Sequence, residues 1–117
     1  MPTRLTTKAR EEGTYMITYA PTDNNGDAIS PETLQWTLLD VNNAVINSRD
    51  SISVSSPDTS NTIVLTGDDL AIDSDGISVV RKILFKATYN ATIDGTNYLG
   101  LVIYIEAEFK IVPLGGV

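Results

Sequence analysis

The residues whose chemistry stands out in this sequence are four aspartates that lie on one segment and precede Gly76. They are Asp68, Asp69, Asp73 and Asp75. Carboxylate oxygens gathered on a loop are the ligands that Ca²⁺ prefers, and Asp-x-Asp-Gly matches part of a calcium-binding loop. The match is partial, because the EF-hand places a Glu six positions after its Gly, where this chain has a Lys. The alternative is a solvated loop whose aspartates cap turns.

A second pair of carboxylates, Glu106 and Glu108, lies two residues apart on one face of an expected strand. Paired carboxylates can hydrolyse glycosides when they flank a substrate cleft. The same face is expected to carry Lys110, with Lys82 and Lys86 across the ladder, which is typical of ordinary cross-strand charge pairing. The chain has no Cys and no His, so disulfides, thiolate metal sites and histidine-based catalysis are excluded. We expect a protein that is not an enzyme and has no cofactor.

Charge is unevenly distributed along the chain. Eight Lys and Arg stand against 15 Asp and Glu, a net charge of −7, which argues against nucleic-acid binding. Arg4, Lys8 and Arg10 all fall in the first ten residues, so this segment could dock on an acidic surface, including a second copy of the chain. A first strand with solvated basic side chains fits equally well. The C-terminal end is apolar, and its Leu114 and Val117 are expected to contact a neighbour, with fraying as the default.

The elements that must position these residues are β-strands, because apolar side chains recur at every second position. β-Branched and aromatic residues dominate the alternating runs. The pattern predicts strands over residues 14–19, 33–38, 45–48, 51–54, 62–66, 82–89 and 98–112. The pairs Asn25-Gly26, Asn42-Asn43 and Asp94-Gly95 mark turns between them. Residues 70–72 are expected to form one helical turn.

The predicted fold class is all-β, a single antiparallel immunoglobulin-like β-sandwich of about seven strands. If residues 1–12 form the first strand, Trp36 lies in the third, where such domains often bury a tryptophan, although the inter-sheet Cys pair and the corner tyrosine are missing. We expect residues 1–12 to form an N-terminal arm or first strand, residues 13–112 the sandwich and residues 113–117 a C-terminal tail. The last strand is a candidate for an edge open to another chain, and Gly100 is a candidate bulge.

No membrane partner is expected. The longest apolar run falls far short of the roughly 20 residues that cross a bilayer. Residues 1–13 also lack the apolar segment of a secretory signal. These observations predict a protein that is synthesised and folds in an aqueous compartment.

Several segments carry a family resemblance, in the order in which they occur. They are Leu5-Thr6-Thr7-Lys8, Gly13-Thr14-Tyr15, Trp36-Thr37-Leu38 with Asp40, Val45-Ile46-Asn47, the run from Thr62 to Leu70, Ala87-Thr88-Tyr89 and Phe109. Together they make the chain resemble the short, cysteine-free virion structural proteins of tailed bacteriophages, over most of its length. The resemblance implies an immunoglobulin-like virion component, present in many copies and attached to the capsid, neck or tail. It brings no catalytic residues with it.

The sequence therefore predicts a non-enzymatic virion structural protein, either a capsid decoration (cement) protein or a neck or tail component. Its partners would be the major capsid protein or neck and tail proteins, in a homo-oligomeric or lattice-bound state. It would be synthesised in the bacterial host cytoplasm and end in the virion. The alternative is a binding module that recognises a carbohydrate or host-surface receptor through loops 21–31, 67–76 and 90–97. A hydrolase built on the two glutamates is a remote third hypothesis.

Overall fold

A computed structural model describes residues 3–5, 7–23, 25–72 and 78–113 of the chain. The strands are β1 (Thr3–Arg4), β2 (Ala9–Arg10), β3 (Thr14–Tyr19), β4 (Thr33–Leu39), β5 (Ile52–Ser53), β6 (Asn61–Thr66), β7 (Val79–Ile93) and β8 (Thr96–Val112). One 3-10 turn, η1 (Gly67–Leu70), follows β6. The predicted all-β sandwich is confirmed, and it has seven strands if β1 and β2 are counted as one interrupted strand. Within these ranges, no helix has the length and apolar character needed to span a membrane.

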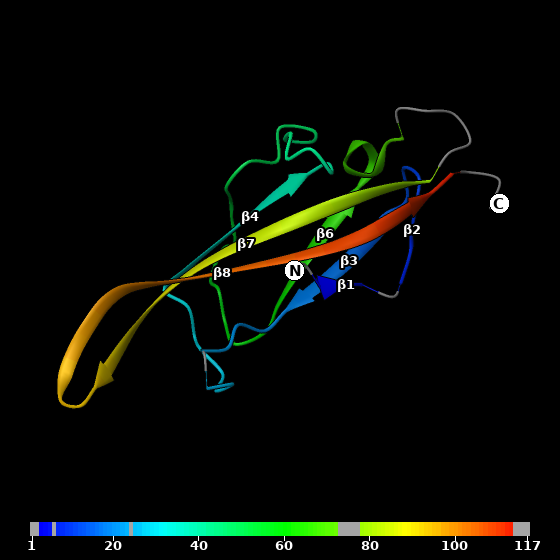
Figure 1. The fold of residues 1–117 in the computed structure, drawn as a ribbon. Helices are drawn as coiled ribbons and strands as arrows, with labels where there is room; N and C mark the ends of the chain where they lie inside the picture. The colour runs from blue at the N-terminus through cyan, green and yellow to red at the C-terminus, as the bar shows by residue number, and fades with distance from the viewer. Residues whose placement is uncertain (1–2, 6, 24, 73–77, 114–117) are drawn as a thin grey trace.

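The strands form two sheets of very different size (Figure 1). The large sheet has the order β1-β8-β7-β4-β5, with β2 also paired to β8, and the small sheet contains only β3 and β6. Most pairings are antiparallel, but β1 and β2 run parallel to β8, which the sequence pattern did not predict. The start of the chain therefore joins the sheet of the last strand, and the chain then crosses to the small sheet at β3.

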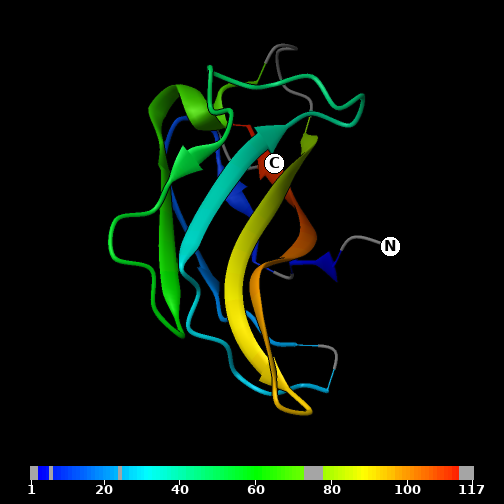
Figure 2. The ribbon, with the colours of Figure 1, turned by 90° about the vertical axis from the view of Figure 1, so that its left-hand side faces the viewer.

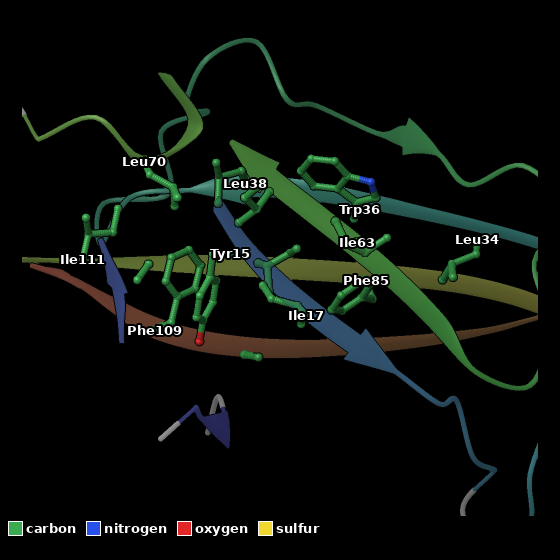
Figure 3. Close-up of a cluster of buried hydrophobic side chains, with 14 of the residues drawn as sticks. Tyr15, Ile17, Leu34, Trp36, Leu38, Ile63, Leu70, Phe85, Phe109 and Ile111 are labelled. Carbon is green, nitrogen blue, oxygen red and sulfur yellow. The ribbon is translucent and has the colours of Figure 1, made fainter. Parts of the chain in front are cut away.

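The core lies between the two sheets and is built from alternate residues of the long strands (Figure 3). Its largest fully buried apolar side chains are Leu34, Leu38, Leu65, Leu70, Ile83, Phe85, Phe109 and Ile111. Tyr15 stacks on Phe109 with ring centroids 4.7 Å apart, and Tyr19 stacks on Phe85 at 4.4 Å. Trp36 is buried between the sheets, as its place in the third predicted strand suggested.

Three predicted boundaries differ from the structure. β7 continues to Ile93 and β8 begins at Thr96, so residues 90–97 are the end of a hairpin rather than a loop. Small polar side chains interrupt the alternation of apolar and polar residues on this stretch, so the periodicity does not predict the strand. Residues 45–48 form no strand, and Val45 makes only an isolated bridge to Leu39. The helical turn begins at Gly67, three residues before the expected position.

A buried carboxylate fastens the turn after β6 to the loop that follows β4. The side chain of Asp69 has no exposed surface. Its Oδ1 accepts hydrogen bonds from Arg49 Nε at 2.7 Å and Asn47 Nδ2 at 2.8 Å. Its Oδ2 accepts from Arg49 Nη2 at 3.3 Å and from the backbone N–H of Thr66 at 3.1 Å. The Arg49 guanidinium also lies over the ring of Trp36, 5.9 Å from its centroid.

These hydrogen bonds decide the charge state of Asp69. Burial by itself raises the pKa of the carboxyl, but the hydrogen bonds from Arg49, Asn47 and Thr66 outweigh burial and hold the pKa below its ordinary value of 3.8. The folded chain therefore binds this proton more weakly than the unfolded chain does. The resulting stabilisation is complete above the unfolded-state pKa and is lost as the pH falls through the lower folded-state pKa.

We predict that Asp69→Ala lowers the free energy of unfolding by about 1.5–3 kcal/mol at neutral pH, because charged hydrogen bonds are lost and their donors are left without an acceptor. Asp68→Ala is the matched control, since Asp68 is the exposed neighbour in the same turn and should change stability by less than about 0.5 kcal/mol. Denaturant titrations followed by Trp36 fluorescence measure both variants.

The same titrations, repeated as the pH is lowered below the ordinary Asp pKa of 3.8, test the charge state of the carboxylate. There the difference in stability between the wild-type chain and Asp69→Ala should narrow, because the unfolded wild-type chain binds a proton at this carboxyl more readily than the folded chain does. A gap that stays constant from neutral pH to acid would contradict the pKa argument. Equal stabilities for the two Asp variants at neutral pH would show that the buried carboxylate does not anchor the turn.

Candidate functional site

Exposed apolar side chains gather at the end of the β7–β8 hairpin. Ten large hydrophobic side chains are exposed among the described residues, and six of them are Ile93, Tyr98, Leu99, Val102, Tyr104 and Ile105. Figures 1 and 2 show this end of the hairpin projecting past β3, β4 and β6. We refer to residues 89–105 as the hairpin arm. An exposed apolar surface of this kind marks an interaction site.

The arm lies outside the sandwich because its two strands are longer than those they pack against. β7 and β8 have 15 and 17 residues, whereas β3 and β6 have six each. β4 pairs with β7 only as far as Thr88, and β1 begins to pair with β8 at Ala107. Beyond the Thr88–Val102 pair the arm is a two-stranded ribbon with no third strand on either side among the described residues, whereas from Val102 to Ile105 only the outer edge of β8 lacks a neighbouring strand there.

A bulge in β8 sets the direction of the arm. The register shifts between Tyr89 and Ala91, because β8 places Leu99 and Gly100 opposite the single residue Asn90. Gly100 has a φ of 67°, in the left-handed region, and its N–H donates to Asn90 Oδ1 at 3.0 Å. The predicted bulge at Gly100 is confirmed. Bulges bend and twist a ribbon locally, so this one aims the tip of the arm.

The arm presents apolar side chains on both faces. Leu101, Ile103 and Ile105 continue the core-facing side of β8 toward the tip, where the small sheet covers it incompletely. Val102 and Tyr104 lie on the opposite face, at 46% and 61% exposed. From residue 87 to residue 105 the only charged side chain is an aspartate in the turn. This run of uncharged, β-forming residues on either side of Asp-Gly was the sequence signal for the arm, and the loop assignment missed it.

Two grooves border the base of the arm. On the outer face of the large sheet, a groove of about 340 Å³ is lined by residues that include Asp50, Lys86 and Tyr104. On the core side, a hollow of about 160 Å³ lies between Tyr19 and Ile105, next to the core. The second groove shows that the small sheet covers the core-facing side of β8 incompletely at this point.

The predicted partner-binding residues of the N-terminal segment lie on the same sheet edge as the arm. Arg4 belongs to β1 and Arg10 to β2, and both strands pair with the outer edge of β8. Lys8 lies between the two strands, and the side chains of Lys8 and Arg10 are exposed. Leu114 and Val117, the predicted contact residues of the tail, lie outside the described residues.

The predicted calcium ligands are not brought together in the described part of the chain. The ligand role is wrong for Asp69, because both of its oxygens accept hydrogen bonds from internal donors. Asp68 points to solvent, while Asp73 and Asp75 lie outside the described residues. Where the structure describes the chain, no three acidic side chains gather in a group that could hold a metal ion.

Turn capping explains the other acidic loop positions. Asp23 Oδ1 accepts the backbone N–H groups of Asn25 at 2.9 Å and Asp27 at 3.0 Å. Asp40 does the same for Ala44 and Asn42, and these two backbone hydrogen bonds hold the pKa of Asp40 below its ordinary value. These two aspartates therefore cap turns, as Asp side chains in loops commonly do.

The two glutamates of the last strand lie on the outer face of the large sheet. Glu108 stands opposite Lys82 in the β7–β8 register, as expected for cross-strand charge pairing. Glu106 stands opposite Leu84, and Lys86 stands opposite a tyrosine instead of a glutamate. The expected pairing is therefore confirmed for one of the two glutamates.

Comparisons with protein-family models, with curated proteins and with solved structures found no match to this chain. The fold class accordingly rests on the structure itself. The function proposed below rests on the geometry of the hairpin arm and on the resemblance that the sequence carries.

We predict that Gly100→Val loosens the arm, because a β-branched residue is strained at a φ of 67°. A Cβ at this position would meet no atom within 4 Å, so the penalty comes from the backbone alone. This backbone penalty is about 1 kcal/mol or more, so the hydrogen-exchange protection of the arm amides should fall at least about fivefold. Gly100→Asn is the matched control, because asparagine tolerates this conformation. Equal protection in both variants would contradict the assigned role of the bulge.

Proposed function

We propose that the protein is a non-enzymatic structural component of a bacteriophage particle, which binds neighbouring subunits through its hairpin arm. Two positions in the particle fit the proposal. The protein is either a capsid decoration protein or a component of the neck or tail. The observation that carries the proposal is the arm itself, a preformed ribbon with apolar side chains on both faces, whose end pairs with no third strand among the described residues. The sequence resemblance to virion structural proteins supports the same role.

The arm is suited to docking in energetic terms. Leu99 is 78% exposed and Ile93 is 51% exposed, so each has most of its apolar surface to lose on binding. Full burial of such a side chain contributes roughly 1.5–3 kcal/mol. The backbone of the arm is already ordered by the β7–β8 ladder. Binding therefore costs less conformational entropy than ordering a free loop would.

A repeated particle lattice gives this binding its effect. A protein that binds the assembled lattice but not its free subunits stabilises the assembled state by mass action. One weak contact per copy is then sufficient to stabilise the assembled particle, because many copies bind the same particle. This mechanism requires binding surfaces and no reacting groups.

Loop-mediated recognition of a carbohydrate or host receptor has weaker support. Residues 90–97, one of the three proposed recognition loops, are paired strands around the two-residue turn Asp94-Gly95. The exposed aromatic side chains Tyr98 and Tyr104 belong to the same ribbon as the exposed aliphatic ones. That mixture fits a protein surface better than an isolated sugar platform.

Purified particles of the phage whose genome encodes the chain should contain it, and quantitative mass spectrometry gives its copy number. A high copy number would indicate the capsid lattice, and a low one the neck or tail.

We further predict that Leu99→Ser with Tyr104→Ser reduces incorporation into particles at least about tenfold, because exposed apolar contact surface is lost.

The matched control is Met16→Ser with Val64→Ser, which removes two exposed apolar side chains from the small sheet. This variant should enter particles as the wild-type chain does. Absence of the wild-type chain from particles would refute the virion role. Equal incorporation of both double variants would instead show that the arm is not the binding surface.

A further inference from the structure

Among the described residues, no strand pairs with the outer edge of β8 over the length of the arm. The N–H of Leu5, next to β1, donates to the carbonyl of Glu108 at 2.8 Å, so Glu108 directs its backbone groups to this edge. Backbone groups alternate between the two sides of an antiparallel strand. The register is unbroken from Val79–Ile111 to Tyr89–Leu101. Val102 and Tyr104 therefore direct their N–H and C=O groups to the same edge.

Two of the usual protections of a strand edge, charges and prolines, are missing along this stretch, which the bulge at Gly100 interrupts. Natural edge strands carry charges or prolines that block further pairing. Residues 95–105 contain no charged residue and no proline, and apolar side chains occupy both faces from Leu101 to Ile105. The strands of the small sheet differ, because one of their faces is buried in the core and the other carries threonines on either side of Met16 and Val64. The geometry of the β8 edge fits a further strand.

We propose that a second copy of the chain occupies this edge, with the two β8 strands antiparallel about a two-fold axis at Ile103. This inference rests on the proposed function and names the partner that the arm binds. In this register Val102 of each copy lies opposite Tyr104 of the other, and Leu101 lies opposite Ile105. Each Val102–Tyr104 pair exchanges two N–H···O bonds, using the backbone groups that point outward. Every opposed pair of side chains is apolar, as a self-complementary interface requires.

The charges at the two ends of the edge favour this antiparallel arrangement. The tip of the arm carries Asp94, the only charge in the ribbon. The other end of the same edge, where β1 and β2 lie, carries the exposed basic side chains Lys8 and Arg10. Antiparallel pairing directs the acidic tip of one copy toward the basic end of the other, twice by symmetry. Parallel pairing would instead place the two acidic tips together.

The length of the shared edge sets the expected affinity. The bulge at Gly100 limits pairing on one side and β1, which begins at Ala107, limits it on the other. An interface confined to five residues per strand and their neighbours is smaller than a standard protein interface. We therefore expect a weak dimer, with a dissociation constant between about 10 µM and 1 mM.

The register is tested by a pair of double variants that differ at one position. Val102→Lys with Tyr104→Glu places opposite charges in both cross-copy pairs, and Val102→Glu with Tyr104→Glu places like charges there. Both variants keep the monomer fold, because these side chains are exposed and Tyr104 stands opposite Lys86 within its own copy. Sedimentation equilibrium should show a dissociation constant at least about tenfold higher for the like-charged variant.

A wild-type chain that stays monomeric up to about 1 mM would overturn the inference. Equal dimerisation of the two variants would also overturn it, because the second copy would then not lie in this register. Particle incorporation separates the inference from the proposed function. If the chain is monomeric but still enters particles, the virion role stands and the dimer is refuted. If the chain dimerises but is absent from particles, the dimer stands and the virion role is refuted.

Discussion

The structure depends on a mismatch in strand length between its two sheets. Strands rise about 3.3 Å per residue, so the six residues of β3 or β6 cover about 20 Å while the 17 residues of β8 extend about 55 Å. The molecule is accordingly 57 Å along its longest axis and 24 Å across. A small sheet can bury only the part of the large sheet that it covers. The core therefore forms at one end of the hairpin, and the other end keeps its apolar side chains exposed.

The covered end holds its shape through a polar contact as well as through apolar packing. Asp69 joins the turn after β6 to the loop after β4, and its partner Arg49 lies over the ring of Trp36. Leu70 follows directly and is fully buried, and its carbonyl accepts the N–H of Glu12 at 3.1 Å. One short turn thus connects the small sheet, the large sheet and the segment after β2. These contacts fix how the two sheets meet at this end, from which the ribbon projects.

The sequence was sufficient to predict those strands that have one buried and one solvated face. Leu34, Trp36 and Leu38 alternate with polar residues because only one side of β4 meets the core. The outer part of the hairpin escaped this argument, since both of its faces are exposed and alternation has no physical cause there. The Asp69–Arg49 contact escaped it as well, because it joins residues 20 positions apart whose pairing depends on how two loops meet. The segment from Asp68 to Asp75 was consequently interpreted as a calcium candidate from its composition alone.

The placement of charge explains how an acidic chain can leave an uncharged edge open to a second copy. Of 23 charged residues, 8 basic and 15 acidic, all but Asp94 lie outside residues 87–105. In the antiparallel arrangement each sandwich lies on its own side of the axis at Ile103. The buried residues of the large sheet stand level with Ile103 to Ile111 of β8, so their middle lies four residues from that axis and the two bodies are centred about 25 Å apart along the strand. Like charges at that distance are screened at physiological salt, where the Debye length is about 8 Å. Repulsion between the bodies therefore opposes side-by-side contacts of the sandwiches and leaves contact through the arms almost unopposed.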